Sequence, residues 1–250
     1  MTLKKMKRFV YAPDPHGSEV NPAAWRVLLD FCADFKPHMR ILGGDVFEFA
    51  PFRGGASAEE RSLSVKEDVA AGIELIHQYK ATHWTYGNHD DRPFRVAEES
   101  RGPLADYAGL IIEQINKVTS KLKVRTYPYR ADSFCPIGPR LRAIHGNAAT
   151  MHTAKIIAET YDNALGGHTH SIDYYQIPSI SLREGWTCGC LRNIYAGFNK
   201  SRRATLRHRH GFGLGFYFDH SPTYYVYQAA SDERGRWLIP STFKEYGHED

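Results

Sequence analysis

The chain has 250 residues, of which 42% are hydrophobic and 24% are charged, and its formal net charge is +4. These values allow one large domain with a substantial core, or at most two small ones, and are those of an ordinary globular protein. The sequence shows no repeat or low-complexity tract, and we expect a single domain, residues 1–250. No apolar run is long enough to cross a bilayer, and the basic start of the chain lacks the apolar stretch of a signal peptide. We therefore expect a cytoplasmic protein without a membrane partner.

Strands and helices alternate over the first part of the chain. Strands are predicted at 8–14, 39–44 and 82–87, and helices from Pro22 to Phe35, at 58–79 and at 104–122, where apolar residues recur with helical spacing. Asn21 followed by Pro22 is typical of a helix start. The segments 50–62 and 91–103 are predicted loops at the edge of the functional site.

Strands dominate after residue 124. They are predicted at 124–129, 140–145, 163–167 and 179–188, with a helix at 152–161 and terminal hairpins from 212–219, 224–228 and 236–239. We expect two sheets packed face to face with helices outside, in which residues 179–240 complete the second sheet. Ligand sites in α/β folds form at the carboxyl ends of strands, so the residues that follow each strand are the candidates.

Four cysteines are too few and too scattered for a disulfide framework. Cys188 and Cys190 form a C-x-C pair, which in a metal protein would need a second Cys pair to complete a zinc site. No such pair is present, so we interpret both as buried thiols rather than as ligands.

Five short motifs with metal-binding side chains follow the predicted strands. They are Asp14-Pro-His16, Gly44-Asp45, Gly87-Asn88-His89-Asp90, His145-Gly146 and Gly167-His168-Thr169-His170. Each motif taken alone is compatible with a turn, a helix cap or a core histidine. Five of them in order, each beside a Gly or Pro that permits a tight turn, indicate a metal site instead.

The ordered set resembles the calcineurin-like metallophosphoesterase family, whose pattern is D-x-H, G-D-x-x-D/E, G-N-H-D/E, H and G-H-x-H. The match runs from Asp14 to His170, and Glu48 stands where the family more often has Asp. The resemblance implies an α/β fold with four αββα layers, in which two mixed β-sheets are flanked by helices. It also implies a centre of two divalent cations, with one cation held by Asp14, His16, Asp45 and His170 and the other by Asp45, Asn88, His145 and His168. Glu48 is not expected to be a ligand.

The same resemblance implies hydrolysis of a phosphate ester by a hydroxide that bridges the two metals. His89 would then be the general acid, oriented by Asp90, while Asn88 would contact metal and phosphate. Arg92 is either a phosphate contact or an exposed arginine at a helix start. Mixed nitrogen and oxygen ligands suit several ions, and we expect manganese in assays, with iron, zinc, magnesium, nickel and cobalt as alternatives.

A basic segment follows the last motif. No acidic residue occurs from Gly185 to Phe218. The segment, including the HGFGLGFY sequence, is similar to that of phage-type or prophage-type members of the family. We expect its arginines to bind the phosphate backbone of a nucleic-acid substrate, with interleaved aromatic rings stacking on bases; a solvated loop with core aromatics is the alternative. The proposed contacts are Arg202, Arg203, Arg207 and Arg209.

These observations favour an enzyme, a metal-dependent phosphodiesterase that acts on a nucleotide or nucleic acid. The alternative within the same class is a phosphomonoesterase, including a protein phosphatase. An alternative of another class is a catalytically silent metal-binding protein, and the intact His89 argues against it.

Overall fold

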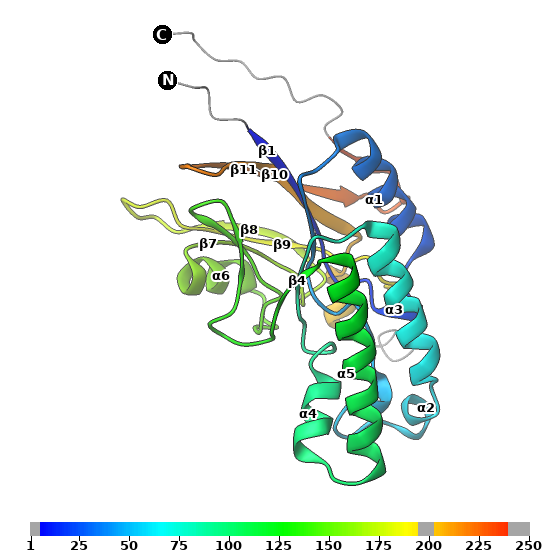
Figure 1. The fold of residues 1–250 in the computed structure, drawn as a ribbon. Coiled ribbons are helices and arrows are strands. Elements are labelled where there is room, and N and C mark those ends of the chain that lie inside the picture. Colours follow the sequence, from blue (N-terminus) through cyan, green and yellow to red (C-terminus); the bar gives the residue numbers. More distant parts are fainter. Residues whose placement is uncertain (1–5, 195–202, 240–250) are drawn as a thin grey trace, which may run out of the picture.

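The computed structural model describes residues 6–194 and 203–239, whose helices and strands are shown in Figure 1. The helices are α1 Pro22–Phe35, α2 Ala58–Arg61, α3 Val65–Tyr79, α4 Arg92–Glu99, α5 Pro103–Leu122 and α6 Thr153–Tyr161. The strands are β1 Lys7–Ala12, β2 Met39–Leu42, β3 His83–Thr85, β4 Arg125–Tyr127, β5 Cys135–Ile137, β6 Leu141–Ala143, β7 Asn163–Gly166, β8 Ile172–Gln176, β9 Glu184–Cys188, β10 Gly211–Phe218, β11 Ser221–Ser231 and β12 Trp237–Leu238.

The strands form two mixed sheets. The first has the order β12-β11-β10-β1-β2-β3-β4, in which β1 to β4 are parallel and β10 to β12 are antiparallel to their neighbours. The second has the order β5-β6-β7-β9-β8, in which β6, β7 and β9 are parallel. The carboxyl ends of β1, β2, β3, β6 and β7 carry the motif loops.

Alternating side chains of β1 divide the core into layers. Phe9 and Tyr11 are buried in a cluster between the two sheets, whereas Val10 and Ala12 pack in the cluster beneath α1 and α3. A third cluster joins the second sheet to α6 through Ile157. Figure 1 shows α1, α3 and α5 on one side of the molecule and α6 on the other. The predicted fold class, an α/β protein with two mixed sheets flanked by helices in four layers, is confirmed.

The prediction that residues 179–240 complete the second sheet is wrong for its C-terminal part. β9 joins the second sheet, but β10 pairs antiparallel with β1 and brings β11 and β12 into the first sheet. Glycines permit this close packing: a Cβ at Gly213 would lie 2.8 Å from Leu165 Cδ2 and 3.0 Å from Cys188 Sγ, both in the second sheet. On the opposite face of β10, Phe212 and Leu214 are buried toward the helices.

Local capping explains where the predicted helices were wrong. The helix expected at 58–79 is two helices, because Ser57 and Ser64 each accept a hydrogen bond from a backbone N–H of the turn that follows.

The predicted loop 91–103 contains α4, and β5 and β8 were not predicted. The start at Pro22 is confirmed, with Asn21 Oδ1 accepting from Ala24 N at 3.0 Å. Among the helices of the described ranges, none is long and apolar enough to span a membrane.

Candidate metal centre

The five motif loops meet at one edge of the two sheets. Backbone hydrogen bonds join them directly: His16 N donates to Asp45 O at 2.8 Å, and Gly167 N donates to His145 O at 2.8 Å. Asp14 Oδ2 accepts from His168 N at 3.0 Å, which connects the first motif to the last across the two sheets. The carboxyl ends of strands from both sheets therefore supply one common site.

One group of donor atoms comprises Asp14, His16 and His170, all buried. His170 Nε2 lies 3.3 Å from Asp14 Oδ1 and 3.3 Å from His16 Nε2. These atoms lie within 4.8 Å of one another, close enough to share one cation.

A second group comprises Asp45, His145 and His168. His145 Nε2 lies 3.4 Å from Asp45 Oδ2 and 3.2 Å from His168 Nδ1. Asn88 Oδ1 is 3.2 Å from the same His145 nitrogen, so the amide oxygen joins this group. The structure thus brings together all seven predicted ligands.

Asp45 stands between the two groups. Its Oδ2 is 3.4 Å from His145 Nε2 and 3.7 Å from His16 Nε2, which belong to different groups. A carboxylate in this position can bridge two cations and offset their repulsion.

The protonation of the imidazoles tests whether cations fit here. Glu48 Oε2 lies 2.6 Å from His16 Nδ1. Burial raises the pKa of Glu48, but His16 and its hydrogen bond lower this pKa well below its usual range. Glu48 is therefore an ionised carboxylate that accepts from the Nδ1–H of His16. Burial and the Arg192 charge lower the pKa of His16 to about 3, so its Nε2 presents a lone pair to the site. A lone pair and several carboxylate oxygens facing one another require a positive charge between them, and the donor set therefore fits divalent cations.

His145, in the second group, also supports a fit to divalent cations. Its Nδ1 donates to Gly43 O at 2.9 Å, so Nε2 faces Asp45 Oδ2 and Asn88 Oδ1, both acceptors. Burial opposes the charged form, but Asp45 outweighs it and raises the pKa of His145 to about 10. In the metal-free protein a proton occupies the position that a cation would take.

Five of the predicted ligands have left-handed backbone conformations. They are Asp14, His16, Asp45, His168 and His170, with φ between 49° and 66°. Non-glycine residues adopt this region rarely, and such strain concentrates at functional sites. The glycines of two motifs serve close approach: a Cβ at Gly87 would overlap Asp45 Oδ1, and one at Gly167 would overlap Asp14 Oδ2.

Two buried carboxylates hold the loop that carries Asp45. Asp90 Oδ1 accepts from the backbone N–H groups of Val46 and Phe47 at 2.8 and 3.0 Å. Asp68 Oδ2, on α3, accepts from those of Glu48 and Phe49 at 3.0 and 2.8 Å. Four consecutive amides of this loop are thereby paired, which stabilises the strained conformation at Asp45.

The predicted role of Asp90 in orienting His89 is therefore wrong. The other oxygen of Asp90 accepts from Gly87 N at 2.9 Å and Trp84 Nε1 at 3.2 Å. His89 is held instead by the carbonyl of Glu48, 2.9 Å from its Nδ1. The Asp90 side chain turns toward the loop that carries Asp45, although Asp90 is adjacent to His89 in the sequence.

His89 and Arg92 lie together beside Asp45. His89 Nε2 is 3.8 Å from Asp45 Oδ2 and 3.1 Å from Arg92 Nη2, and Arg92 Nη1 donates to Glu48 O at 2.6 Å. Burial opposes protonation of His89, but Asp45 and Glu48 outweigh it and raise its pKa. Arg92 is half-buried at the centre, which rules out the alternative of an exposed arginine. His89 also forms a possible ligand group with His16 and Asp45.

Sequence reasoning missed two residues from the segment after the last motif. Arg192 is only 3% exposed, and its Nη1 lies 3.5 Å from Glu48 Oε2. It therefore pairs with the carboxylate that accepts from His16. His208 packs its ring against His170, with centroids 4.8 Å apart. The position of this segment after the last motif indicated that it could approach the candidate metal centre. No local pattern shows that Arg192, rather than a neighbouring basic residue, contacts Glu48.

The structure describes two of the four arginine side chains expected to bind nucleic acid, and that role stays a prediction. Arg209 N donates to His170 O at 2.8 Å, which places this residue of the segment beside the centre. Its guanidinium donates to Ser231 O at 2.9 Å, and that of Arg207 is 3.8 Å from Asp173 Oδ2. Arg202 lies outside the described residues, as does the side chain of Arg203.

The predicted stacking of bases on aromatic rings of this segment is wrong for the rings that the structure describes. Phe212, Phe216 and Tyr217 are buried in the core, as the alternative interpretation expected. Tyr195 and Phe198 lie outside the described residues.

The interpretation of Cys188 and Cys190 as buried thiols is confirmed.

Comparison with known proteins gives structural similarity at low identity. No family model matches the sequence, and no curated protein does. Among solved structures, a single mutant of Vps29 from Entamoeba histolytica is 12% identical, with a TM-score of 0.49 and coverage of 92% of this chain and 97% of that one. Vacuolar Protein Sorting 29 from Cryptosporidium parvum is 15% identical, with a TM-score of 0.48 and coverage of 94% and 96%. YfcE, a phosphoesterase from E. coli, is 14% identical, with a TM-score of 0.39 and coverage of 89% and 98%.

Proposed function

We propose that this protein is a metal-dependent phosphoesterase that acts on phosphodiesters. The observation that carries the proposal is the placement of Asp45 Oδ2, which lies 3.4 Å from His145 Nε2 and 3.7 Å from His16 Nε2. Two groups of buried and half-buried donors that share one carboxylate suit a pair of divalent cations, and paired cations are typical of phosphoester hydrolysis.

The residues would hold the cations in two sets that share Asp45. The first is Asp14, His16, Asp45 and His170, and the second is Asp45, Asn88, His145 and His168. When bound, the cations supply an activated water and neutralise charge on the phosphate. Manganese is the ion that we propose for assays, because mixed imidazole and carboxylate ligands suit it.

His89 supplies the proton for the leaving oxygen. Its Nδ1 is held by Glu48 O, which leaves Nε2 directed toward Asp45 and Arg92. When His89 is protonated, its Nε2–H and the Arg92 Nη2–H face each other as two donors. A phosphate oxygen between them accepts from both, so substrate binding resolves the conflict and positions the proton.

The preference for a diester, and for a nucleotide or nucleic acid, rests on charge. The segment from Gly185 to Phe218 has no carboxylate side chain, and within it Arg209 N donates to His170 O of the last motif. A polyanionic substrate would meet little repulsion on this side of the centre.

The test is reconstitution of the purified protein with Mn²⁺, followed by assays with bis-p-nitrophenyl phosphate and p-nitrophenyl phosphate. We expect hydrolysis that favours the diester, and we expect Asp45→Asn to lose bound metal and activity together. Asp34→Asn, an exposed aspartate on α1, is the matched control and should behave as the unchanged protein.

The outcomes separate the alternatives. Faster hydrolysis of the monoester would favour a phosphatase. Metal binding with no hydrolysis of either ester would indicate a silent metal-binding protein. An Asp45→Asn variant that stays fully active would overturn the shared-carboxylate centre.

A further inference from the structure

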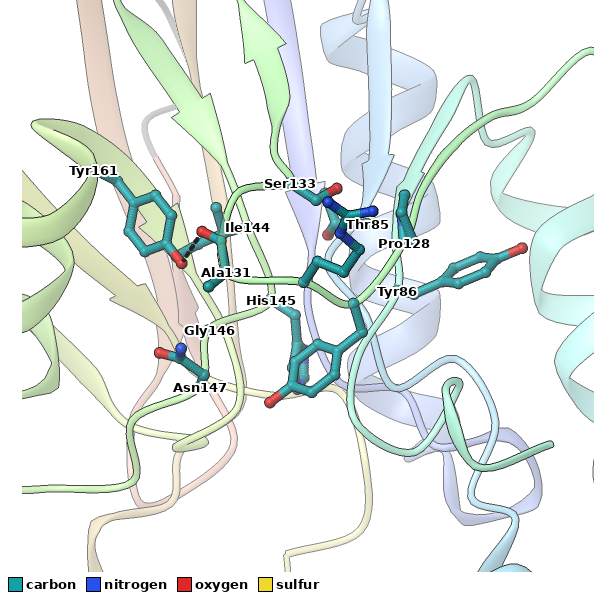
Figure 2. Close-up of a pocket in the computed structure, with 12 residues that line it drawn as sticks. Thr85, Tyr86, Pro128, Ala131, Ser133, Ile144, His145, Gly146, Asn147 and Tyr161 are labelled. Carbon is teal, nitrogen blue, oxygen red and sulfur yellow. Dashed lines mark hydrogen bonds between the residues drawn. The ribbon is translucent and has the colours of Figure 1, made fainter. Parts of the chain in front are cut away.

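A cavity of about 100 Å³ opens beside the candidate centre, and Figure 2 shows it with its lining residues. Its walls come from the end of β3, from the segment after β4, from the segment after β6 and from α6. They are Thr85, Tyr86, Pro128, Tyr129, Arg130, Ala131, Ser133, Ile144, His145, Gly146, Asn147 and Tyr161. The cavity therefore lies between the two sheets at the carboxyl ends of parallel strands, where ligands of α/β folds bind.

His145 belongs both to the cavity and to the candidate metal centre. The residue lines the cavity, while its Nε2 lies 3.4 Å from Asp45 Oδ2 and 3.2 Å from Asn88 Oδ1. In Figure 2, His145 stands between Asn147 on one side and Tyr86 on the other. His145 is therefore the residue through which the cavity adjoins the second set of candidate ligands.

The lining has the chemistry of a site for a polar aromatic ring. Tyr129 places its ring centroid 6.0 Å from that of His145, with the planes at 70°, so it offers an aromatic wall. Ser133 contributes a hydroxyl, and the exposed Asn147 contributes an amide that both donates and accepts. The Tyr161 hydroxyl donates to Ala131 O at 3.0 Å, which braces the 128–133 wall. No carboxylate lines the cavity, so a ring attached to a phosphate meets no like charge.

The small volume favours a single ring over a fused one. The cavity, at about 100 Å³, is smaller than an enclosed apolar cavity of roughly 150 Å³ that holds benzene, so a six-membered ring enters it only in part and a fused bicyclic ring less still. We propose that this cavity binds the pyrimidine base of a nucleotide phosphodiester, an inference that rests on the proposed phosphodiesterase function. The protein then prefers pyrimidine over purine nucleotides on the esterified phosphate.

The experiment compares three diesters with the same leaving group in the manganese-loaded protein. They are the p-nitrophenyl esters of thymidine 5′-phosphate, adenosine 5′-phosphate and methyl phosphate. Because stacking of a base on an aromatic side chain contributes roughly 1–3 kcal/mol, we expect kcat/KM for the thymidine ester to exceed that for the methyl ester by about tenfold or more. The adenosine ester should lie near the methyl ester.

Variants of the lining connect that preference to the cavity. Asn147→Ala, which removes the amide, and Ser133→Leu, which fills the space, should each bring the thymidine-to-methyl ratio of kcat/KM toward one. Asn116→Ala, at an exposed position on α5, is the control and should retain the ratio. Using two lining variants with different chemistry keeps the test valid if one fails to fold.

Each outcome has a definite meaning. Hydrolysis of the methyl ester without a thymidine preference would overturn the pyrimidine site and leave the proposed function intact. A preference that survives both lining variants would place the base elsewhere and also overturn the proposal. No hydrolysis of any of the three diesters would overturn the proposed function and this inference together.

Discussion

The three imidazoles nearest Asp45 Oδ2 have different tasks in the proposed centre. His16 and His145 have their Nδ1 atoms occupied by Glu48 and by Gly43 O, which fixes the Nε2 of each toward the cations. His89 is held by a backbone carbonyl and also contacts Arg92. Its raised pKa favours a protonated ring, as a general acid requires.

Replacement of His89 separates the acid from the ligands. We expect His89→Asn to keep metal content close to that of the unchanged protein and to lower kcat by roughly 10²–10⁴-fold, because a positioned general acid contributes that much. The loss should be largest for substrates with poor leaving groups, which need the proton most. His77→Asn, at an exposed position on α3, is the control. Loss of a metal ion from His89→Asn would instead make His89 a ligand.

Asp90 affects the centre through the Asp45 loop. Asn at this position keeps one acceptor oxygen and turns an NH₂ group toward N–H donors, so we expect Asp90→Asn to lower the free energy of unfolding by roughly 1–3 kcal/mol. Metal affinity should fall with it because the loop positions Asp45. Denaturant unfolding and metal titration measure both effects, with the half-buried neighbour Asp91→Asn as the control. Unchanged stability and affinity would show that these hydrogen bonds do not hold the loop.

At the scale of elements, the loop that follows β2 depends on two distant segments. α3 supplies Asp68 and the turn after β3 supplies Asp90, so each carboxylate pairs two successive amides of the loop. Arg209 of the basic segment donates its backbone N–H to His170 of the last motif. Residues that are far apart along the chain therefore contact the motif loops.

The basic segment should contribute to binding of long substrates. We propose that its arginines contact phosphates of a single-stranded nucleic acid, so the dependence of log affinity on log salt should have a slope of roughly −0.7 per contact. Neutralising Arg202, Arg203, Arg207 and Arg209 together should flatten this slope and raise KM for an oligonucleotide. The small diester bis-p-nitrophenyl phosphate should show little change in KM, because it is too short to reach several arginines.

Four exposed arginines elsewhere provide the control. They are Arg26, Arg61, Arg101 and Arg234. Neutralising them changes the net charge equally, so an equal effect on the salt slope would show that net charge, and not this segment, attracts the substrate. An equal rise of KM for both substrates in the first variant would make the segment part of the active site. The Arg209 guanidinium also donates to Ser231 O, so its neutralisation can lower stability. The melting temperature of each variant should therefore be measured together with its salt slope and its KM.

For the whole molecule, metal binding and folding are linked through His145. Burial and His145 lower the pKa of His168 to about 4, and His16 titrates near 3, so both rings are neutral at pH 7. His145 titrates near 10 and must lose its proton to bind a cation. In the metal-free protein, this raised pKa contributes stability that is fully present below the unfolded value near 6.5 and is lost as pH rises toward 10.

The melting temperatures of the metal-free and Mn²⁺-loaded proteins should therefore diverge as pH rises. Between pH 6.5 and 8.5, we expect the metal-free protein, in EDTA, to lose stability while metal binding strengthens, so that the difference between the two temperatures widens. Differential scanning calorimetry in a series of buffers measures this. A difference that does not change with pH would mean that His145 carries no proton in the metal-free protein.

Local sequence determined much of the site and little of what surrounds it. Apolar runs followed by Gly, Asp, Asn and His indicated the strand ends and the motifs that contain the seven candidate ligands, because each candidate and the strand that positions it lie within a few residues of each other. The cap at Asn21 was equally local. Only the tertiary structure decided the partners of Asp90, the burial of Arg192 and the sheet that β10 joins. Those partners are far apart along the chain, 44 residues from Val46 to Asp90 and 144 from Glu48 to Arg192, and no local pattern specifies such pairs.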